Sequence, residues 1–162
     1  AESIDDDEQD CSIALTAVAE IQLEKGDIKG AQATSSLIED HGWRENCLCA
    51  IVEAKVEVGE LTSAEQMALQ MEFDHQRSRA LLSVAEAFHK QGNREKALPL
   101  AEEALAANGG RGDIGLIAKS ILCDCHEKAL AVVDKYDSAE YDELANELGI
   151  FNYFPPRPTI AA

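Results

Sequence analysis

The sequence is poor in basic residues, although it is rich in charge. Its 14 Lys and Arg residues are outnumbered by 31 Asp and Glu residues, which gives a formal net charge of −17 at pH 7. A surface this acidic repels phosphate backbones and anionic lipid, so we expect no nucleic-acid partner. The charge suits a basic protein segment or a cation, and simple solubility is the alternative explanation.

The sequence also lacks a long apolar run. No stretch approaches the roughly 18 apolar residues that a membrane span needs, so we expect no membrane insertion. A secretory signal pattern is absent too, but the chain begins at Ala1 rather than Met, which leaves a cleaved leader open. The five cysteines are an odd number, whereas a disulfide framework needs an even one. We therefore expect the cytoplasm or another reducing compartment.

Aromatic residues are scarce, at 5% of the chain, whereas apolar residues as a whole make up 46%. Ala and Leu dominate the apolar fraction, which favours closely packed helices over a β-sandwich. A length of 162 residues fits one compact domain or one short repeat array.

Glycine recurs with a period of 33 residues, at Gly26, Gly59 and Gly92. Alanine recurs with the same period at Ala31, Ala64 and Ala97. A sustained period of this length is typical of stacked repeats. Each period is interpreted as two antiparallel helices, because the glycine ends one helix and a capping residue begins the next. The predicted caps are Asp27, Asn93 and a capping box formed by Thr62 and Glu65.

Extended along the chain, this pattern predicts nine helices. They are expected at about residues 10–25, 28–40, 43–58, 62–72, 76–91, 94–107, 114–124, 126–135 and 139–148. A fourth, degenerate repeat has Asp124 where a glycine is expected, and the charged last helix is expected to cap the array. Residues 1–9 are predicted to be a flexible acidic tail, residues 10–149 the repeat domain, and residues 150–162 an extended tail.

The segment Leu81 to Asn108 carries the run Leu-x-x-Val-Ala-Glu-Ala-Phe-x-Lys-Gln-Gly-Asn-x-x-x-Ala and resembles a tetratricopeptide repeat. The resemblance covers about residues 13–135 and departs from the family in two respects: the period is one residue short, and the proline that normally closes each repeat is absent. It implies a right-handed α-solenoid of antiparallel helix pairs, with about four TPR-like repeats and a C-terminal capping helix. A HEAT-like repeat is the alternative fold.

Such proteins typically bind an extended or helical segment of a partner in a concave groove, and they carry no chemistry of their own. The resemblance therefore implies a non-catalytic interaction scaffold, adaptor or accessory subunit that is not an enzyme and needs no cofactor. Carried over residue by residue, the groove positions are Glu20, Glu24, Glu53, Glu57, Glu86 and His89. A basic segment of the partner would relieve the repulsion between these carboxylates. Alternatively, the glutamates are solvated helix formers.

The C-terminal tail combines aromatic residues with prolines. Its candidate docking residues are Phe151, Tyr153, Phe154, Pro155 and Pro156. The prolines favour polyproline II, a shape suited to docking, and exposed aromatics need a cover. The tail is expected either to fold back on the last helices or to dock into a partner or a second copy of the chain.

Two motifs point to chemical alternatives. Cys123, Cys125 and His126 could make the protein responsive to metal or redox state, although residues two apart on a helix point roughly 200° apart and cannot chelate together. The run 110–115 matches G-x-G-x-x-G, but no predicted strand precedes it, so a dinucleotide site is not expected. A further alternative is a regulatory repeat domain of a longer enzyme or signalling protein.

Overall fold

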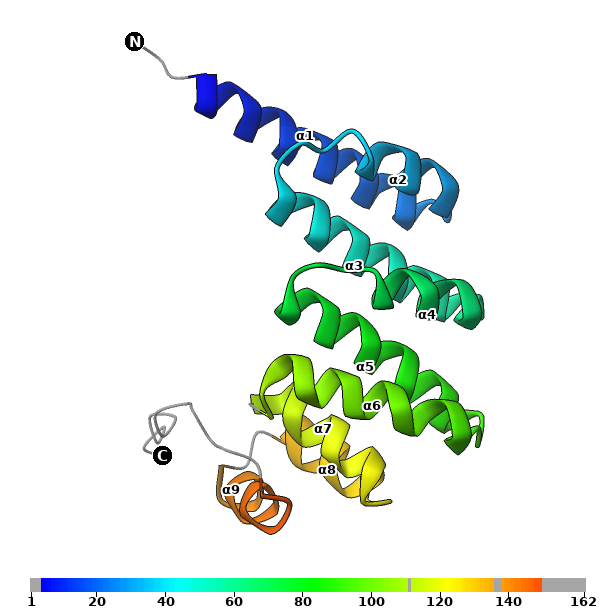
Figure 1. The fold of residues 1–162 in the computed structure, drawn as a ribbon, viewed down its shortest axis with the longest axis vertical. Helices are drawn as coiled ribbons and strands as arrows, with labels where there is room; N and C mark the ends of the chain where they lie inside the picture. Colours follow the sequence, from blue (N-terminus) through cyan, green and yellow to red (C-terminus); the bar gives the residue numbers. More distant parts are fainter. Residues whose placement is uncertain (1–3, 111, 136–137, 150–162) are drawn as a thin grey trace. The chain divides into compact units, whose positions relative to one another are not determined.

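The computed structural model describes residues 4–110, 112–135 and 138–149. Within these ranges the chain forms nine α-helices and no strand, so the predicted all-α fold is confirmed (Figure 1). The helices are α1 (Ile4–Glu24), α2 (Ile28–Ser35), α3 (His41–Glu57), α4 (Leu61–Leu69), α5 (Asp74–Lys90), α6 (Arg94–Asn108), α7 (Gly112–Leu122), α8 (His126–Lys135) and α9 (Ser138–Glu147). The predicted docking tail, with Phe151, Tyr153, Phe154, Pro155 and Pro156, lies outside the described residues.

The chain divides into two compact units, Ala1–Val84 and Ala85–Ala162, and the division falls inside helix α5. In the first unit, α1 packs against α2 and α3, and α3 also packs against α2 and α4. In the second unit, contacts between helices join α6 to α7, α7 to α8 and α8 to α9. In both units, therefore, helices that follow one another in the sequence lie against each other.

Small and branched apolar side chains form the core of the first unit. Ala19, Ala31, Ile38, Cys47 and Ile51 form one cluster contributed by α1, α2, α3 and the loop before α3. The buried alanines let helix backbones approach closely, as their repeated spacing predicts. In the second unit a separate cluster of Ala129, Leu144 and Ala145 joins α8 to α9.

The turns inside the predicted repeats follow the glycine pattern. Gly26, Gly59 and Gly92 have φ angles of 76°, 81° and 73°, the left-handed conformation that glycine adopts without cost. Asp27 then caps α2 by accepting a hydrogen bond from the amide of Gly30, and Asn93 caps α6 through the amide of Lys96. Both caps were predicted from the sequence.

Asp124 occupies the glycine position of the predicted fourth repeat. It is the one described non-glycine residue with a positive φ, at 60°. Aspartate tolerates this conformation better than most residues because its short polar side chain can bond locally. The carboxylate of Asp124 also forms an ion pair with Arg94 of α6, which helps to hold the turn between α7 and α8.

Several helix boundaries differ from the predicted ones, and three of these differences have an identifiable cause. Helix α1 begins at Ile4, so residues 4–9 are helical rather than a tail; an acidic run also suits a helix start, because it complements the positive end of the helix dipole. Helix α2 ends at Ser35 instead of residue 40, since Leu37 and Ile38 make shorter i→i+3 backbone bonds. The Thr62–Glu65 capping box is wrong: the N-cap of α4 is Glu60, whose side chain pairs with Lys55 instead.

The G-x-G-x-x-G run has a structural role. A Cβ atom added to Gly115 would lie 2.6 Å from the backbone carbon of Gly110. Only glycine therefore lets helix α7 approach the loop that follows α6 this closely.

We predict that Gly59→Ala lowers the free energy of unfolding by about 1–2 kcal/mol, because alanine is strained at this positive φ although nothing crowds the site. Gly59→Asn is expected to cost less, since asparagine tolerates the left-handed conformation. Urea denaturation followed by circular dichroism measures both variants. Equal losses for alanine and asparagine would contradict a conformational cause.

Candidate functional site

The predicted groove residues fall into both units. Glu20 and Glu24 lie on α1, and Glu57 lies at the end of α3; all three are exposed. Glu53 is half-buried on α3. Glu86 and His89 lie on the part of α5 that belongs to the second unit, and both are half-buried. Each unit must therefore be considered as a site by itself.

Glu53 is already paired within the first unit. Its Oε1 atom lies 2.8 Å from Nη2 of Arg79, and the Cys49 thiol lies 3.9 Å from the same carboxylate. An internal cation already neutralises this carboxylate, so it gains less from a basic partner than a free carboxylate does. Of the predicted groove residues in the first unit, Glu20, Glu24 and Glu57 therefore remain as candidates for binding a basic partner.

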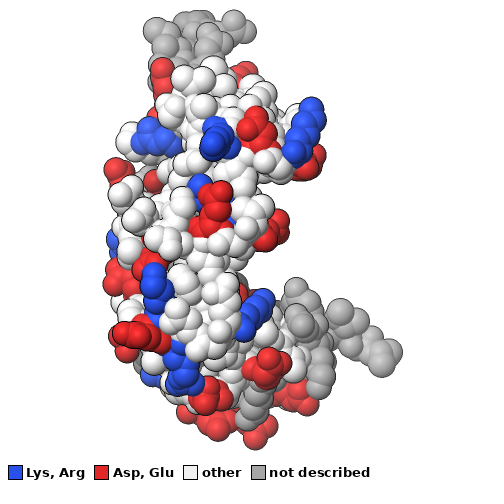
Figure 2. All heavy atoms as spheres, turned by 90° about the vertical axis from the view of Figure 1, so that its right-hand side faces the viewer, with Lys and Arg blue, Asp and Glu red and all other residues white. Residues whose placement is uncertain are grey.

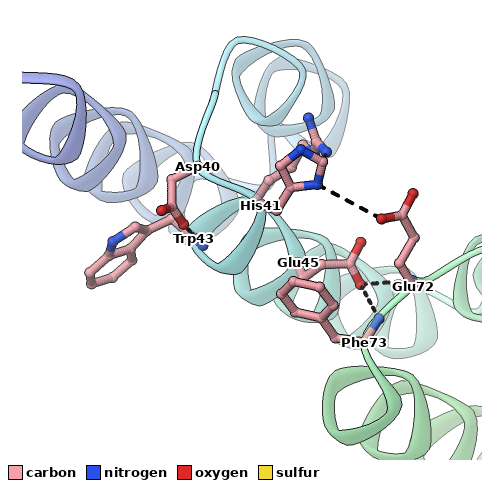
Figure 3. Close-up of polar contacts among 7 residues, drawn as sticks. Asp40, His41, Trp43, Glu45, Glu72 and Phe73 are labelled. Carbon is pink, nitrogen blue, oxygen red and sulfur yellow. Dashed lines mark hydrogen bonds and ion pairs between the residues drawn. The ribbon is translucent and has the colours of Figure 1, made fainter. Parts of the chain in front are cut away.

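Two buried polar side chains fix the helices that carry these carboxylates, α1 and α3, by hydrogen bonds to loop amides. Ser12 of α1 accepts a hydrogen bond from the amide of Asp40 at 3.4 Å. Glu45 of α3 accepts hydrogen bonds from the amides of Glu72 and Phe73 at 3.2 and 3.5 Å (Figure 3). Each side chain thereby fastens the first helix of a pair to the loop that leaves that pair.

Sequence reasoning missed this role. Ser12, Glu45 and Ser78 follow the 33-residue period, and all three are buried. A polar residue that recurs on the apolar side of a repeated helix was the available signal, because buried polar groups need partners.

Charge alone does not mark out a site. On the face drawn in Figure 2, the Asp and Glu side chains of the described residues are interspersed with Lys and Arg. Within the predicted groove set, Glu20, Glu24 and Glu57 differ from Glu53 and Glu86 in that they are exposed and form no ion pair with a Lys or Arg of the described chain.

Large apolar side chains are exposed in the first unit. Helix α1 carries three of them, Ile13, Val18 and Ile21. Four more lie at helix ends and in loops: Leu37, Val58, Leu69 and Phe73. Single exposed apolar residues are ordinary, but several on one helix mark a surface that can bind another protein.

The second unit contains a buried polar cluster around His126. Its Nδ1 atom lies 3.2 Å from the hydroxyl of Ser120, and its Nε2 atom lies 3.3 Å from Oε1 of Glu86. The ring of His89 packs edge-on against that of His126, with centroids 5.0 Å apart. Burial, together with His89 and Lys90, lowers the pKa of His126, and burial raises the pKa of Glu86.

The hydrogen bonds of this cluster specify where its protons lie. The hydroxyl of Ser120 donates to the carbonyl of Ile117 at 2.6 Å, which favours the tautomer of His126 whose Nδ1 donates to Ser120. In the neutral ring Nε2 is then an acceptor that faces the carboxyl group of Glu86. Nε2 is buried and has no hydrogen-bond partner, and two acceptors at this distance repel each other, so a proton on either group would relieve the contact.

The cluster resembles a serine–histidine–carboxylate arrangement but cannot act as one on a bound substrate. Ser120 is fully buried and its proton is committed to the backbone. A nucleophile has to reach its substrate, so this cluster has a structural role.

The alternative metal or redox site is not assembled. Cys123 is exposed, Cys125 is half-buried, and both nitrogens of His126 face Ser120 and Glu86. Among the described side chains, no three His, Cys, Asp or Glu groups are placed to hold a metal ion. This observation gives no support to the metal-responsive hypothesis.

A hollow of about 340 Å³ lies in the second unit. Its lining is mostly apolar or glycine, from Leu105, Ala106, Gly109, Gly110, Leu148 and Gly149, with Glu102 and Lys119 as the charged residues. Specific small-molecule sites usually combine an apolar wall with several convergent polar groups. Among its described lining residues, this hollow offers one acid and one base.

Comparisons with family models, curated proteins and solved structures give no match to this chain. No described helix combines the length and the apolar character that crossing a bilayer requires.

We predict that stability depends on pH through the Glu86–His126 pair. Because the pKa of Glu86 is raised in the folded state, its contribution is fully present below the unfolded value of 4.5 and is lost as pH rises through the folded pKa. Glu86→Gln supplies a permanent amide donor to His126. Its stability relative to wild type should therefore increase from pH 4.5 towards neutrality.

Urea denaturation over a pH series measures this difference. Glu102→Gln, an exposed glutamate of α6, is the control and should show no such trend. A difference between Glu86→Gln and wild type that stays constant with pH would contradict the proton assignment.

We also predict two classes of thiol reactivity. Burial raises the pKa of Cys47 and Cys49 from 9.0 to about 11, with Glu20 and Glu53 as further causes. The thiolate is the reactive form, so this shift alone slows alkylation about a hundredfold, whereas Cys11 and Cys123 are exposed. Timed iodoacetamide labelling with peptide mapping distinguishes the two classes, and in urea all rates should converge. Equal rates in the native protein would contradict the burial.

Proposed function

We propose that this chain is a non-catalytic protein-interaction module, acting as a scaffold, adaptor or accessory subunit. Its first unit would bind a basic or extended segment of a partner protein. The observation that carries the proposal is that three of the five glutamates predicted to line the groove, Glu20, Glu24 and Glu57, are exposed and form no ion pair with Lys or Arg in the described chain.

The contrast with the other predicted glutamates supports this choice. Glu53 is neutralised by Arg79, and Glu86 faces His126, so neither is free to recruit a cation. A Lys or Arg side chain from a partner could bond to the free carboxylates and relieve their mutual repulsion. Electrostatic attraction of this kind also speeds association, because opposite charges steer the encounter.

The wider architecture is part of the same proposal. The 33-residue period, the glycine turns and the buried alanines fit a TPR-like α-solenoid of helix pairs. Arrays of this kind offer extended surfaces that suit partner segments rather than small substrates.

We predict that the triple variant Glu20→Lys/Glu24→Lys/Glu57→Lys loses the partner that the wild-type chain captures from native extract. Like charges would then oppose a basic segment. Affinity capture at low and high salt with mass spectrometry checks this, and binding through exposed charges should weaken at high salt.

The matched control is Glu102→Lys/Glu103→Lys/Glu95→Lys, three exposed glutamates of α6 in the second unit. It changes the net charge equally and should retain the partner. Loss of the partner from both triple variants would attribute capture to overall charge. Retention by both would exclude this acidic surface as the binding site.

A further inference from the structure

Helix α1 has an apolar stripe that nothing in the described structure covers. Ala14, Ala17, Val18 and Ile21 follow the spacing i, i+3, i+4, i+7 and so share one face, and Ile13 lies at its edge. All five are exposed; Val18 is 46% and Ile21 50% accessible. A helix usually turns such a stripe towards a core.

The 33-residue period identifies what this face is in the neighbouring repeats. Ala14 aligns with Cys47 of α3 and Ala80 of α5, and both of these are buried. Val18 aligns with Ile51 and Val84, which are 0% exposed. Ala17 and Ile21 align with positions that are half-buried in α3 and α5. The same helix face is therefore at least partly covered in α3 and α5 and open in α1.

The contacts of α3 show what kind of surface covers this face. Cys47 and Ile51 pack in one cluster with Ala19, Ala31 and Ile38, which come from the preceding helix pair and the loop after it. The cover is thus a helix surface made of small and branched apolar residues. The open stripe on α1 has the matching chemistry for a helix of the same kind.

The charge of α1 favours a basic partner helix over a second copy of this chain as the occupant of the stripe. Helix α1 contains seven acidic residues and no Lys or Arg: Asp5, Asp6, Asp7, Glu8, Asp10, Glu20 and Glu24. Glu20 and Glu24 lie four residues apart on one flank of the apolar stripe. Pairing α1 with the α1 of a second copy would bring two acidic helices together, whereas a helix flanked by Lys or Arg would be attracted.

We infer that the stripe Ala14–Ala17–Val18–Ile21 of α1 is a docking surface for an amphipathic helix of a partner protein. The partner helix presents small and branched apolar residues to the stripe and Lys or Arg side chains to Glu20 and Glu24. This inference rests on the proposed protein-binding function and specifies its partner: affinity comes from apolar burial, and the acidic flank selects the partner.

The test uses three labelled synthetic peptides of equal length. One is helical, with an Ala/Ile/Leu face flanked by Lys; the second has Glu in place of Lys; the third is a scrambled version of the first. We expect the Lys-flanked peptide to bind the full chain, and the other two to bind at least about tenfold more weakly in fluorescence anisotropy titrations. Absence of binding by the Lys-flanked peptide overturns the inference.

Variants then locate the binding. Val18→Ser/Ile21→Ser should weaken the Lys-flanked peptide about tenfold or more, because it removes apolar contact area without touching an acidic residue. Leu37→Ser/Val58→Ser removes two apolar residues that are even more exposed, elsewhere in the first unit, and should leave binding unchanged. If wild type and Val18→Ser/Ile21→Ser bind the peptide equally, the apolar stripe contributes nothing to binding and the inference is overturned.

Sedimentation of the wild-type chain tests the remaining occupant. We expect the stripe to take no part in self-association. A wild-type dimer that dissociates in the Val18→Ser/Ile21→Ser variant would assign the stripe to a second copy and overturn the inference. Failure of this inference is distinguishable from failure of the proposed function. The affinity-capture experiment that tests the proposed function changes Glu20, Glu24 and Glu57 and leaves Val18 and Ile21 intact.

Discussion

A helix pair of this size cannot bury its own apolar surface, and that limitation shapes the molecule. Isolated short helices are marginal in water, so each pair depends on the neighbour that covers it. Ala31 of α2 is completely buried because α1 and α3 both approach it, and Ile51 of α3 is buried by the pair before it. The open stripe of α1 marks the place where the described chain supplies no such neighbour.

Repetition extends to the polar contacts as well as the apolar ones. Ser12 reaches the amide of Asp40, and Glu45 reaches that of Phe73, and both contacts span 28 residues. A serine and a glutamate at equivalent positions of the period thus both accept a hydrogen bond from a loop amide. A buried carboxylate is costly without partners, so Glu45 is acceptable in the core only because the loop points its amides inward.

The sequence specifies local structure in this chain better than it specifies partners in space. Gly26, Gly59 and Gly92 mark helix ends because glycine tolerates a positive φ whatever surrounds it. Asp27 and Asn93 mark helix starts because their side chains reach an amide only three residues away. The predicted cap at Thr62 is wrong because α4 already begins at Leu61, and the side chain of its N-cap residue, Glu60, pairs with Lys55. Pairs such as Glu53–Arg79 and Glu86–His126 join helices that are distant in sequence. Spacing alone therefore could not separate the free glutamates from the neutralised ones.

The single tryptophan has an optical consequence. Trp43 lies in the first turn of α3, where its amide donates to Asp40 and its ring packs against the core cluster of the first unit. Since the chain has no second tryptophan, indole emission reports on the surroundings of one unit only. Indole emission therefore follows unfolding around Trp43, whereas circular dichroism follows all the described helices together.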